Sequence, residues 1–561
     1  MPVLRSLPRL AAALPAVLLA ALLAVPAAHA QREGVLEIGT PLSELLVRQA
    51  AAGRLPSGSA DAQPLSAAAA ARLLDTLATR TAELSAADRA LVARYRGEAA
   101  PPRRAPFGLY ADGAVPLRIA GEGYAVEIEP RLYLSTGPAR RTTTDTRSGG
   151  VRAFQASRGV RVAGHLGRHL FFDTRAEENQ RRDPLLAYDA AGSTTSRLGF
   201  VKLPGGGDTY DYFTATGAVG YTDRFVEVRL ARDRNRVGPG VNSLYLSDYA
   251  APYDQLQIRA AAGPFRYSSV FARLTSPERT AGNTVLPSRF GAFHQAGITV
   301  GRVDVNVFES VLFRDDTTDG NRSGFEIAYL NPVIFYRSVE SEIGSGDNAL
   351  LGASVAVRPV DGVRIYGQGV LDEFTAARFF DDYWANKWGV LGGVHTVDRL
   401  LPGLELRAEA ARLRPFLYSH FSSGSAVTHY GDPLAYAAGV NAVDLSFFAR
   451  YRPTVRVEAA LNAARTVRGR NPDGQNVGAD PRLPYTTRDM ALDLDGVPTL
   501  TGVRQTEMLV EARLAYEVLP GFFAETAVVA TSLVDAERGA TRSLAGLLQL
   551  RWGVPFRSQR Y

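Results

Sequence analysis

The chain has 561 residues, a formal charge of +6 from 63 basic and 57 acidic side chains, a mean hydropathy of −0.08 and no cysteine. The lack of cysteine excludes disulfides, thiolate metal sites and cysteine nucleophiles, and so small an excess of positive charge gives no support for nucleic-acid binding. The basic side chains are almost all arginine, since Lys202 and Lys387 are the two lysines. Arginine suits bidentate pairing with carboxylates in a polar interior.

The chain begins with the pattern of a secretory signal peptide. Arg5 and Arg9 give a positive start, residues 10–25 are a short apolar run, and Ala28-His29-Ala30 is a small-x-small cleavage site. This pattern predicts that residues 1–30 are a cleaved signal peptide, with an uncleaved membrane anchor as the alternative. We therefore expect an exported protein.

The rest of the chain has no apolar run that would form a membrane-spanning helix. Charged residues interrupt each later apolar run well before the roughly 20 residues that such a helix needs. Because only helices and closed barrels satisfy their backbone groups in lipid, an exported chain of this kind is either soluble or a β-barrel of the outer membrane.

Residues 31–106 predict a short helical segment on the periplasmic side. Residues 41–52 read as a first helix, Ser66 would cap a second over 67–81, and Ser85 would cap a third. Prolines at 101, 102 and 106 then end the helical pattern. Helices this short need a packing partner.

From residue 107 to the end, the hydrophobic period changes to two. Val510 and Leu514, for example, lie on the opposite face from Glu511 and Arg513, and the same mixture of acids and arginines recurs strand after strand. An outer face in lipid and a polar lumen produce this alternation, whereas the polar face of a soluble sandwich needs no such regular mixture. The pattern predicts a large antiparallel transmembrane β-barrel.

Short turns alternate with long polar connections, as expected of a barrel with periplasmic turns and external loops. The short turns are residues 167–168, 222–223, 263–264, 301–302, 358–362, 399–403, 450–453 and 519–521. The long connections are residues 135–158, 181–208, 234–253, 275–291, 314–347, 372–387, 414–436, 466–504 and 533–542. This layout predicts about 18 strands, and a range of about 16 to 20 because residues 196–203 and 325–339 are apolar enough to hold another hairpin.

One outward position conflicts with this pattern. Val303, Val305 and Val307 set a lipid-facing row that Glu309 would continue, so a bulge or a place near the headgroups is expected there. The final aromatic residue, Tyr561, agrees with a barrel strand at the end of the chain.

No enzyme motif is present, so we expect no catalytic activity, cofactor or metal site. Asp381-Asp382 reads as solvated loop charge rather than as paired catalytic acids, and His420 and His429 lack further ligands at metal spacing. A hydrolase with an embedded dyad remains an alternative, since such sites are recognised by geometry.

Three loop segments combine aromatic rings with polar side chains, the mixture that stacks on sugar rings and bonds their hydroxyls. The alternative is that the aromatic residues belong to the girdle at the membrane boundary. The candidate polysaccharide-binding residues are Asn242, Tyr245, Asp248, Tyr249, Trp384, Asn386, Trp388, His420, His429 and Tyr430.

Several of these stretches resemble the Wzi-type capsule-assembly outer-membrane proteins, in the branch found in Bacteroidetes. The matching segments, in chain order, are Gly238–Asp248, Phe308-Glu309, Tyr329–Tyr336, Trp384–Gly389 and His429–Ala435. The helical segment followed by a barrel also matches the family over the mature chain. Asn242 departs from the family pattern, which has arginine before Ser-Leu.

The resemblance implies an eighteen-stranded barrel with a periplasmic helical bundle and a lectin-like role in capsule assembly. The expected partners are a capsular or extracellular polysaccharide, for which arginine-rich loops would suit an acidic one, the lipid of the outer membrane, and the barrel-assembly machinery. The competing prediction is a porin-like channel for small solutes, which the charged lumen would also suit.

Overall fold

The computed structural model describes residues 32–99, 109–111, 113–144, 150–182, 195–196, 199–202, 209–276, 287–314, 327–331, 346–379, 381–492 and 496–556. The predicted signal peptide, residues 332–339 of the second candidate hairpin, and Tyr561 lie outside these residues.

Three short helices open the described chain: α2 (Pro41–Ala52), α3 (Ala67–Ala78) and α4 (Ala86–Tyr95). Each helix begins after a hydroxyl side chain that accepts a hydrogen bond from a backbone N–H of the first turn. Thr40 caps α2, and the predicted residues Ser66 and Ser85 cap α3 and α4. The second helix ends at Ala78, earlier than expected, and the 3-10 turn η1 (Thr81–Glu83) follows it. Small strands join the helices: β1 (Val35–Leu36), β2 (Ala62–Gln63) and β3 (Leu65–Ser66).

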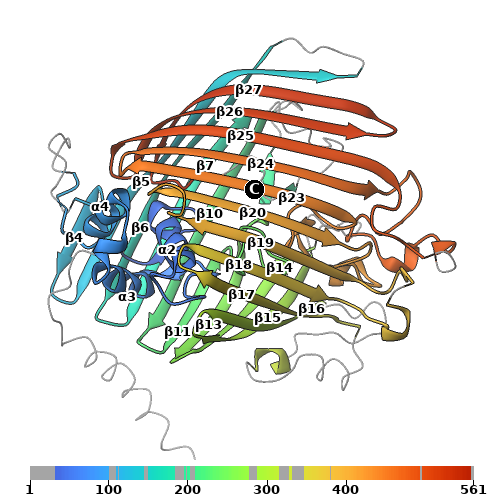
Figure 1. Ribbon diagram of the computed structural model, residues 1–561, viewed down its shortest axis with the longest axis horizontal. Helices are drawn as coiled ribbons and strands as arrows, with labels where there is room; N and C mark the ends of the chain where they lie inside the picture. The colour runs from blue at the N-terminus through green and yellow to red at the C-terminus, as the bar shows by residue number, and fades with distance from the viewer. Residues whose placement is uncertain are drawn as a thin grey trace, which may run out of the picture.

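In the described part of the chain, 18 antiparallel strands close into one barrel, which confirms the predicted fold (Figure 1). The last strand pairs with the first, with Leu544 opposite Arg140. The strands are β5 (Tyr124–Thr143), β6 (Val151–Leu166), β7 (Leu170–Arg182), β10 (Thr209–Thr222), β11 (Val226–Asp233), β13 (Tyr253–Ala262), β14 (Phe265–Thr275), β15 (Ser288–Val300), β16 (Val303–Arg314), β17 (Asn348–Val360), β18 (Val363–Leu371), β19 (Trp388–Val397), β20 (Leu404–Leu413), β23 (Ala442–Thr454), β24 (Val457–Arg470), β25 (Val503–Leu519), β26 (Phe522–Asp535) and β27 (Gly539–Trp552).

Short turns alternate with longer connections along the barrel, but two of the predicted long connections are wrong in extent. β5 continues to Thr143 and β6 begins at Val151, and only residues 536–538 separate β26 from β27. The short turns meet at one end, here called the turn end, and the long connections meet at the opposite loop end (Figure 1). Residues 195–202 do form an extra hairpin, β8 (Thr195–Ser196) and β9 (Gly199–Lys202), which pairs with β10 at the loop end. A short strand, β4 (Leu117–Gly121), pairs with the start of β5.

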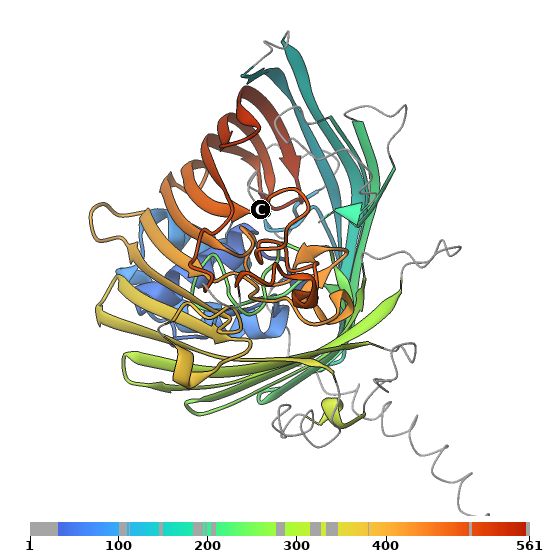
Figure 2. The same ribbon diagram turned by 90° about the vertical axis from the view of Figure 1, so that its right-hand side faces the viewer.

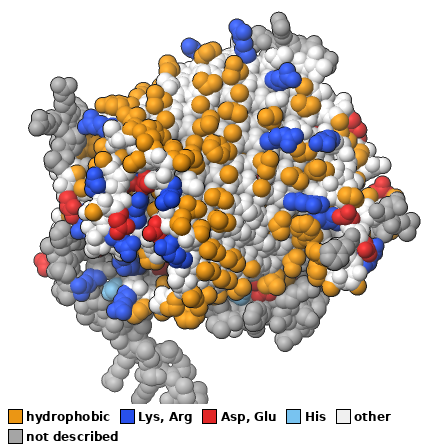
Figure 3. All heavy atoms as spheres, viewed as in Figure 1, with side chains coloured by type: hydrophobic (Ala, Val, Ile, Leu, Met, Phe, Trp, Pro, Cys, Tyr) orange, Lys and Arg blue, Asp and Glu red, His pale blue; other side chains and the backbone are white. Residues whose placement is uncertain are grey.

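The outer face carries a belt of exposed apolar side chains, and the inner face carries the charged ones. Leu514 and Leu548 are 55% and 65% exposed, whereas Glu511 and Arg513 are buried. Figure 3 shows this hydrophobic belt across the barrel wall. In the described residues, no helix is long and apolar enough to cross a membrane. The belt gives the strands the lipid-facing surface of a membrane barrel.

Glu309 does continue the outward row, but there is no bulge at this position because the register with β15 and β17 runs through it without a shift. Its carboxylate lies 3.1 Å from Nε2 of His294, the directly opposite outward residue, and Glu309 is buried. Nearby, the turn η4 (Ile327–Leu330) covers the same outer face, with Tyr329 packed on Phe313 at 4.9 Å between ring centroids. Of the two expected arrangements, the bulge is therefore wrong, and Glu309 is instead paired and buried.

The helices occupy the turn end of the barrel, inside the outline of the strands (Figures 1 and 2). Leu42, Leu46 and Leu74 form part of their own apolar core. Ion pairs then join this helical segment to the barrel wall: Arg94 Nη1 lies 2.8 Å from Glu517 Oε1, and Arg131 Nη1 lies 2.8 Å from Glu37 Oε2.

From the other end, residues 234–252, here called the inward loop, fold into the lumen. A short strand in this loop, β12 (Arg236–Val237), pairs with β2 of the helical segment, and Gly238 N donates to Asp61 O at 2.9 Å. Tyr245 and Leu246 of the loop lie in a large buried core together with residues of the connection after β20, such as Leu434. The two ends of the lumen are thus linked by a backbone ladder.

Substitution of Val528 tests whether the outer face of the barrel meets lipid. This residue lies near the middle of β26 and is 53% exposed on the outer face. We expect Val528→Arg to lower the free energy of unfolding in a bilayer by about 2–4 kcal/mol, since a lipid-facing charge at mid-depth must be desolvated. Urea titration in lipid vesicles measures this change, with Val528→Leu as the matched control. Equal stability of the two variants would mean that this face does not meet lipid.

Candidate functional site

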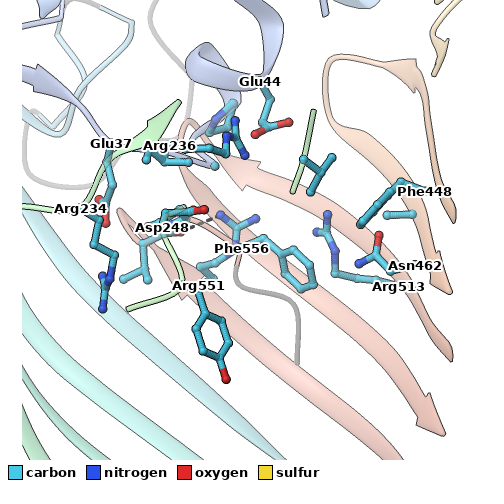
Figure 4. Close-up of a pocket in the computed structure, with 18 of the residues that line it drawn as sticks. Glu37, Glu44, Arg234, Arg236, Asp248, Phe448, Asn462, Arg513, Arg551 and Phe556 are labelled. Carbon is cyan, nitrogen blue, oxygen red and sulfur yellow. Dashed lines mark hydrogen bonds between the residues drawn. The ribbon is translucent and has the colours of Figure 1, made fainter. Parts of the chain in front are cut away.

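A cavity of about 280 Å³ lies in the lumen beside the inward loop. The helical segment supplies Glu37 and Glu44, the inward loop supplies Asn242 and Asp248, and the inner faces of β5–β7, β10, β20 and β23–β27 supply the wall. Figure 4 shows the labelled side chains converging from these three sources. The volume is slightly below the range of small-ligand pockets, which begins at roughly 300 Å³.

Ion pairs fix the base of the cavity. Glu44 Oε2 accepts a hydrogen bond from Arg450 Nη1 at 2.7 Å. Burial alone would raise the pKa of Glu44, but Arg450 and Arg236 outweigh it and lower that pKa below its usual value. Glu44 is therefore ionised at neutral pH, and the helical segment is held against β23 by charge.

The wall arginines are also matched by carboxylates. Glu525 accepts from Arg513 at 3.0 Å and from Arg551 at 2.7 Å, and Glu458 pairs with both Arg452 and Arg513. Eight arginines and seven carboxylates line the cavity in all. Such a network presents donors and acceptors side by side without a large net charge, which suits a polyhydroxylated ligand with an occasional acidic group.

Aromatic rings complete the lining: Tyr133, Tyr212, Tyr249, Phe448, Phe523 and Phe556. Two of them already carry a guanidinium on one face, since Arg513 Cζ is 4.1 Å from the Phe556 ring centroid and Arg551 Cζ is 4.2 Å from that of Phe523. Tyr249 and Phe448 are half-buried, from the inward loop and from β23 respectively. These two rings offer the apolar contact that a sugar ring requires.

Of the residues that the sequence singled out, Asn242, Asp248 and Tyr249 line this cavity. Asn242 is committed to the fold, because its Nδ2 donates to Glu409 Oε2 at 2.7 Å and its backbone N donates to the same oxygen at 3.1 Å. Tyr366 donates its hydroxyl to Glu409 at 2.7 Å. Glu409 thus clamps the inward loop to β18 and β20, and Asn242 positions the loop.

Tyr245 belongs to the buried core of the lumen and does not line the cavity. Its ring packs on Phe308 at 4.4 Å between centroids, and its hydroxyl donates to the backbone oxygens of His294 and Glu309. It is 5% exposed, so it anchors the loop in the lumen core.

Trp384 belongs to a separate cluster at the loop end. Its ring packs against Phe416 and Tyr485, and Arg488 Cζ lies 4.1 Å from its centroid. Asn386 in the same connection is buried, accepts from Thr375 N and donates to Arg378 O. Both residues hold surface connections together, and neither presents a face to a ligand in this structure.

Trp388 takes the place that the girdle alternative predicts. It starts β19 on the outer face, opposite Leu371, and packs near Phe379 and under Arg412. Exposed Phe374 and Phe379 lie beside it. These rings form an aromatic patch at the edge of the belt.

His420 and His429 are buried in the connection after β20, and Tyr430 follows with its backbone N bonded to Thr275 O. His429 Nδ1 accepts from Thr275 N at 3.0 Å, and His420 packs edge-on against Tyr485. The described residues contain no group of three ligands that would hold a metal. These side chains pack the loops and lie apart from the cavity lining.

Sequence reasoning missed the wall residues, such as Arg450, Phe448 and Arg513, as site candidates. They carry the ordinary inward signal of a strand, which by itself predicts only charge pairing in a polar lumen. A search for inward aromatic residues between β23 and β26, such as Phe448 and Phe523, would have found part of the lining.

No family model matches the chain, and no curated protein matches it. Among solved structures, Wzi of Escherichia coli, an outer-membrane carbohydrate-binding β-barrel involved in group 1 capsule assembly, aligns with a TM-score of 0.54 at 14% identity, over 94% of this chain and 100% of its own. OccK8 (OprE) of Pseudomonas aeruginosa has a TM-score of 0.40 at 8% identity, over 76% of this chain and 98% of its own. A BenF-like porin of Pseudomonas fluorescens has a TM-score of 0.41 at 10% identity, over the same shares of 76% and 98%.

The likeness to Wzi shows a shared outer-membrane barrel fold, which agrees with the family resemblance in the sequence at that level. Assignment to the branch found in Bacteroidetes remains a prediction. The two other alignments are too weak to support an argument.

The buried histidines predict a pH dependence of the folded loops. Burial lowers the pKa of His420 to about 3, aided by Lys387, and burial lowers that of His429 to about 3, aided by Arg289. The folded pKa of each histidine lies below the unfolded value near 6.5. The stability that each neutral, buried imidazole contributes is therefore complete above that pH and is lost as the pH falls toward 3. We expect on the order of 2 kcal/mol per histidine to be lost between pH 7 and 5.

Hydrogen exchange over residues 414–441, corrected for the intrinsic pH effect, measures this loss. His429→Gln should reduce the dependence, and His169→Gln, in a short turn, should leave it unchanged. Equal protection at pH 7 and pH 5 would refute the prediction.

Proposed function

We propose that this chain is a non-catalytic, lectin-like barrel of the outer membrane that binds or anchors a capsular or extracellular polysaccharide at the cell surface. The single observation that carries the proposal is the luminal cavity, in which aromatic rings, amides and ion-paired arginines face one another. This composition binds sugars through stacking on ring faces and hydrogen bonds to hydroxyls. Wzi, which has a similar fold, is a carbohydrate-binding β-barrel, and this agrees with the proposal.

Arginines on two sides of the lining would suit an acidic group on the polysaccharide, although the lining as a whole is nearly balanced in charge. Arg234 and Arg236 of the inward loop and Arg513 of β25 all line the cavity (Figure 4). Arg236 Nη2 donates to Gln63 Oε1 at 3.2 Å, and Arg234 Nε donates to Ala250 O at 2.8 Å. A carboxylate on the sugar would meet guanidinium donors from two sides.

The linked ends of the lumen support binding rather than passage. The ladder between β12 and β2 joins the inward loop to the helical segment, and Arg364 Nη1 bonds Asp61 Oδ1 at 2.8 Å beside it. A solute would have to break these contacts to cross. A channel for small solutes is the second candidate function, and conductance measurements in planar bilayers test it.

Removal of the two half-buried rings tests the cavity directly. We expect Tyr249→Ala combined with Phe448→Ala to weaken polysaccharide binding by about tenfold or more, at roughly 1 kcal/mol for each lost ring contact. Calorimetric titration of the purified barrel with polysaccharide from its host measures this. Phe374→Ala combined with Phe379→Ala, which removes two exposed rings outside the cavity, should bind as the wild type does. Unchanged binding by the cavity variant would place the site elsewhere.

Deletion of the gene in the native host tests the biological role. We expect polysaccharide to move from the cells into the medium, because the chains lose their attachment, and quantification of both fractions measures this. Complementation with the wild-type gene should restore the coat, and the cavity variant should not. An unchanged coat together with measurable conductance would favour the channel.

A further inference from the structure

Outward-facing arginines gather at the loop end of three neighbouring strands. Arg542 of β27, Arg140 of β5 and Arg152 of β6 are exposed and lie on the outer face, because Arg542 pairs opposite Thr142 and Arg152 opposite Pro138. We call these three residues the arginine row. Successive members are diagonal neighbours across a strand pair, at roughly 7–8 Å, within reach of one shared group.

The arginine row lies at the edge of the apolar belt. Leu544, opposite Arg140, is 55% exposed, and Leu548 and Leu550 continue the same outer face toward the turn end. Figure 3 shows basic side chains along the loop-side edge of the hydrophobic surface. The guanidinium groups therefore sit at the height where the hydrocarbon of a membrane gives way to its headgroups.

Two other outward arginines have carboxylate partners on the neighbouring strand. Arg158 Nη2 lies 2.8 Å from Glu178, and Arg232 Nη1 lies 3.0 Å from Asp254. In contrast, no described residue gives Arg140, Arg152 or Arg542 an ion pair or a side-chain hydrogen bond, and the described outer faces of β27, β5 and β6 carry no carboxylate. Like charges held this close repel one another unless an anion lies between them.

We propose that the arginine row binds the phosphate groups of the glycolipid that forms the outer leaflet of the membrane. Phosphate oxygens accept the paired N–H donors of guanidinium groups, and the acyl chains of the same molecule would pack on Leu544 and Leu548. A headgroup with two phosphates would neutralise the mutual repulsion of three cations. The proposal rests on the placement of the loop end at the cell surface and does not depend on polysaccharide binding in the cavity.

The test uses the full mature barrel in detergent and native mass spectrometry with a diphosphorylated lipid A-type glycolipid. The wild type should retain the glycolipid at least tenfold better than the same molecule with both phosphates removed. The triple variant Arg140→Gln, Arg152→Gln, Arg542→Gln should lose this phosphate preference, and raising the salt concentration should weaken binding to the wild type.

The matched control removes three exposed arginines at the turn end, Arg168→Gln, Arg399→Gln and Arg456→Gln, and should bind as the wild type does. Migration of the unheated barrel on a gel checks that each variant is folded. Wild-type binding without phosphate preference, or a triple variant that keeps the preference, would overturn the proposal. Polysaccharide titration of the triple variant should be unchanged, and a loss there would assign the row to the polysaccharide instead.

Discussion

The structure depends on the need to pair every backbone N–H and C=O within lipid, which a sheet achieves only by closing on itself. Closure between β27 and β5 leaves no edge, and the two-residue period then sends each neighbouring side chain to lipid or to the lumen. The apolar belt, the charged interior and the separation of turns from loops all follow from that closure. Even Glu309, on the wrong side, is tolerated because His294 pairs with it across one rung.

The barrel could be predicted from the sequence because its signals are local. Glycine-containing turns such as Gly301-Arg302 and alternating runs such as residues 510–514 are each visible within a few residues, and so are the caps Ser66 and Ser85. The strand number then followed from counting. The residues of the binding site were harder to predict from the sequence, because aromatic residues in loops can either bind ligands or pack the loops together.

The cavity depends on contacts between distant segments, which no local pattern records. Trp384 looks like a sugar platform until Arg488, about a hundred positions later in the chain, is found over its ring. Arg450 looks like one more lumen charge until Glu44 of the helical segment is found against it. Asn242, Asp248 and Tyr249 were predicted together because they share one loop, and that loop happens to be the one that folds inward.

The pairing of β12 with β2 forms a mechanical connection through the lumen between the helical segment and the inward loop. Because Val237 also bridges to Leu246, a displacement of the helical segment is carried through this ladder to the base of the inward loop, and from there to the wall of the cavity. A force applied to the helical segment at the turn end would therefore reach the inward loop without any movement of the barrel strands.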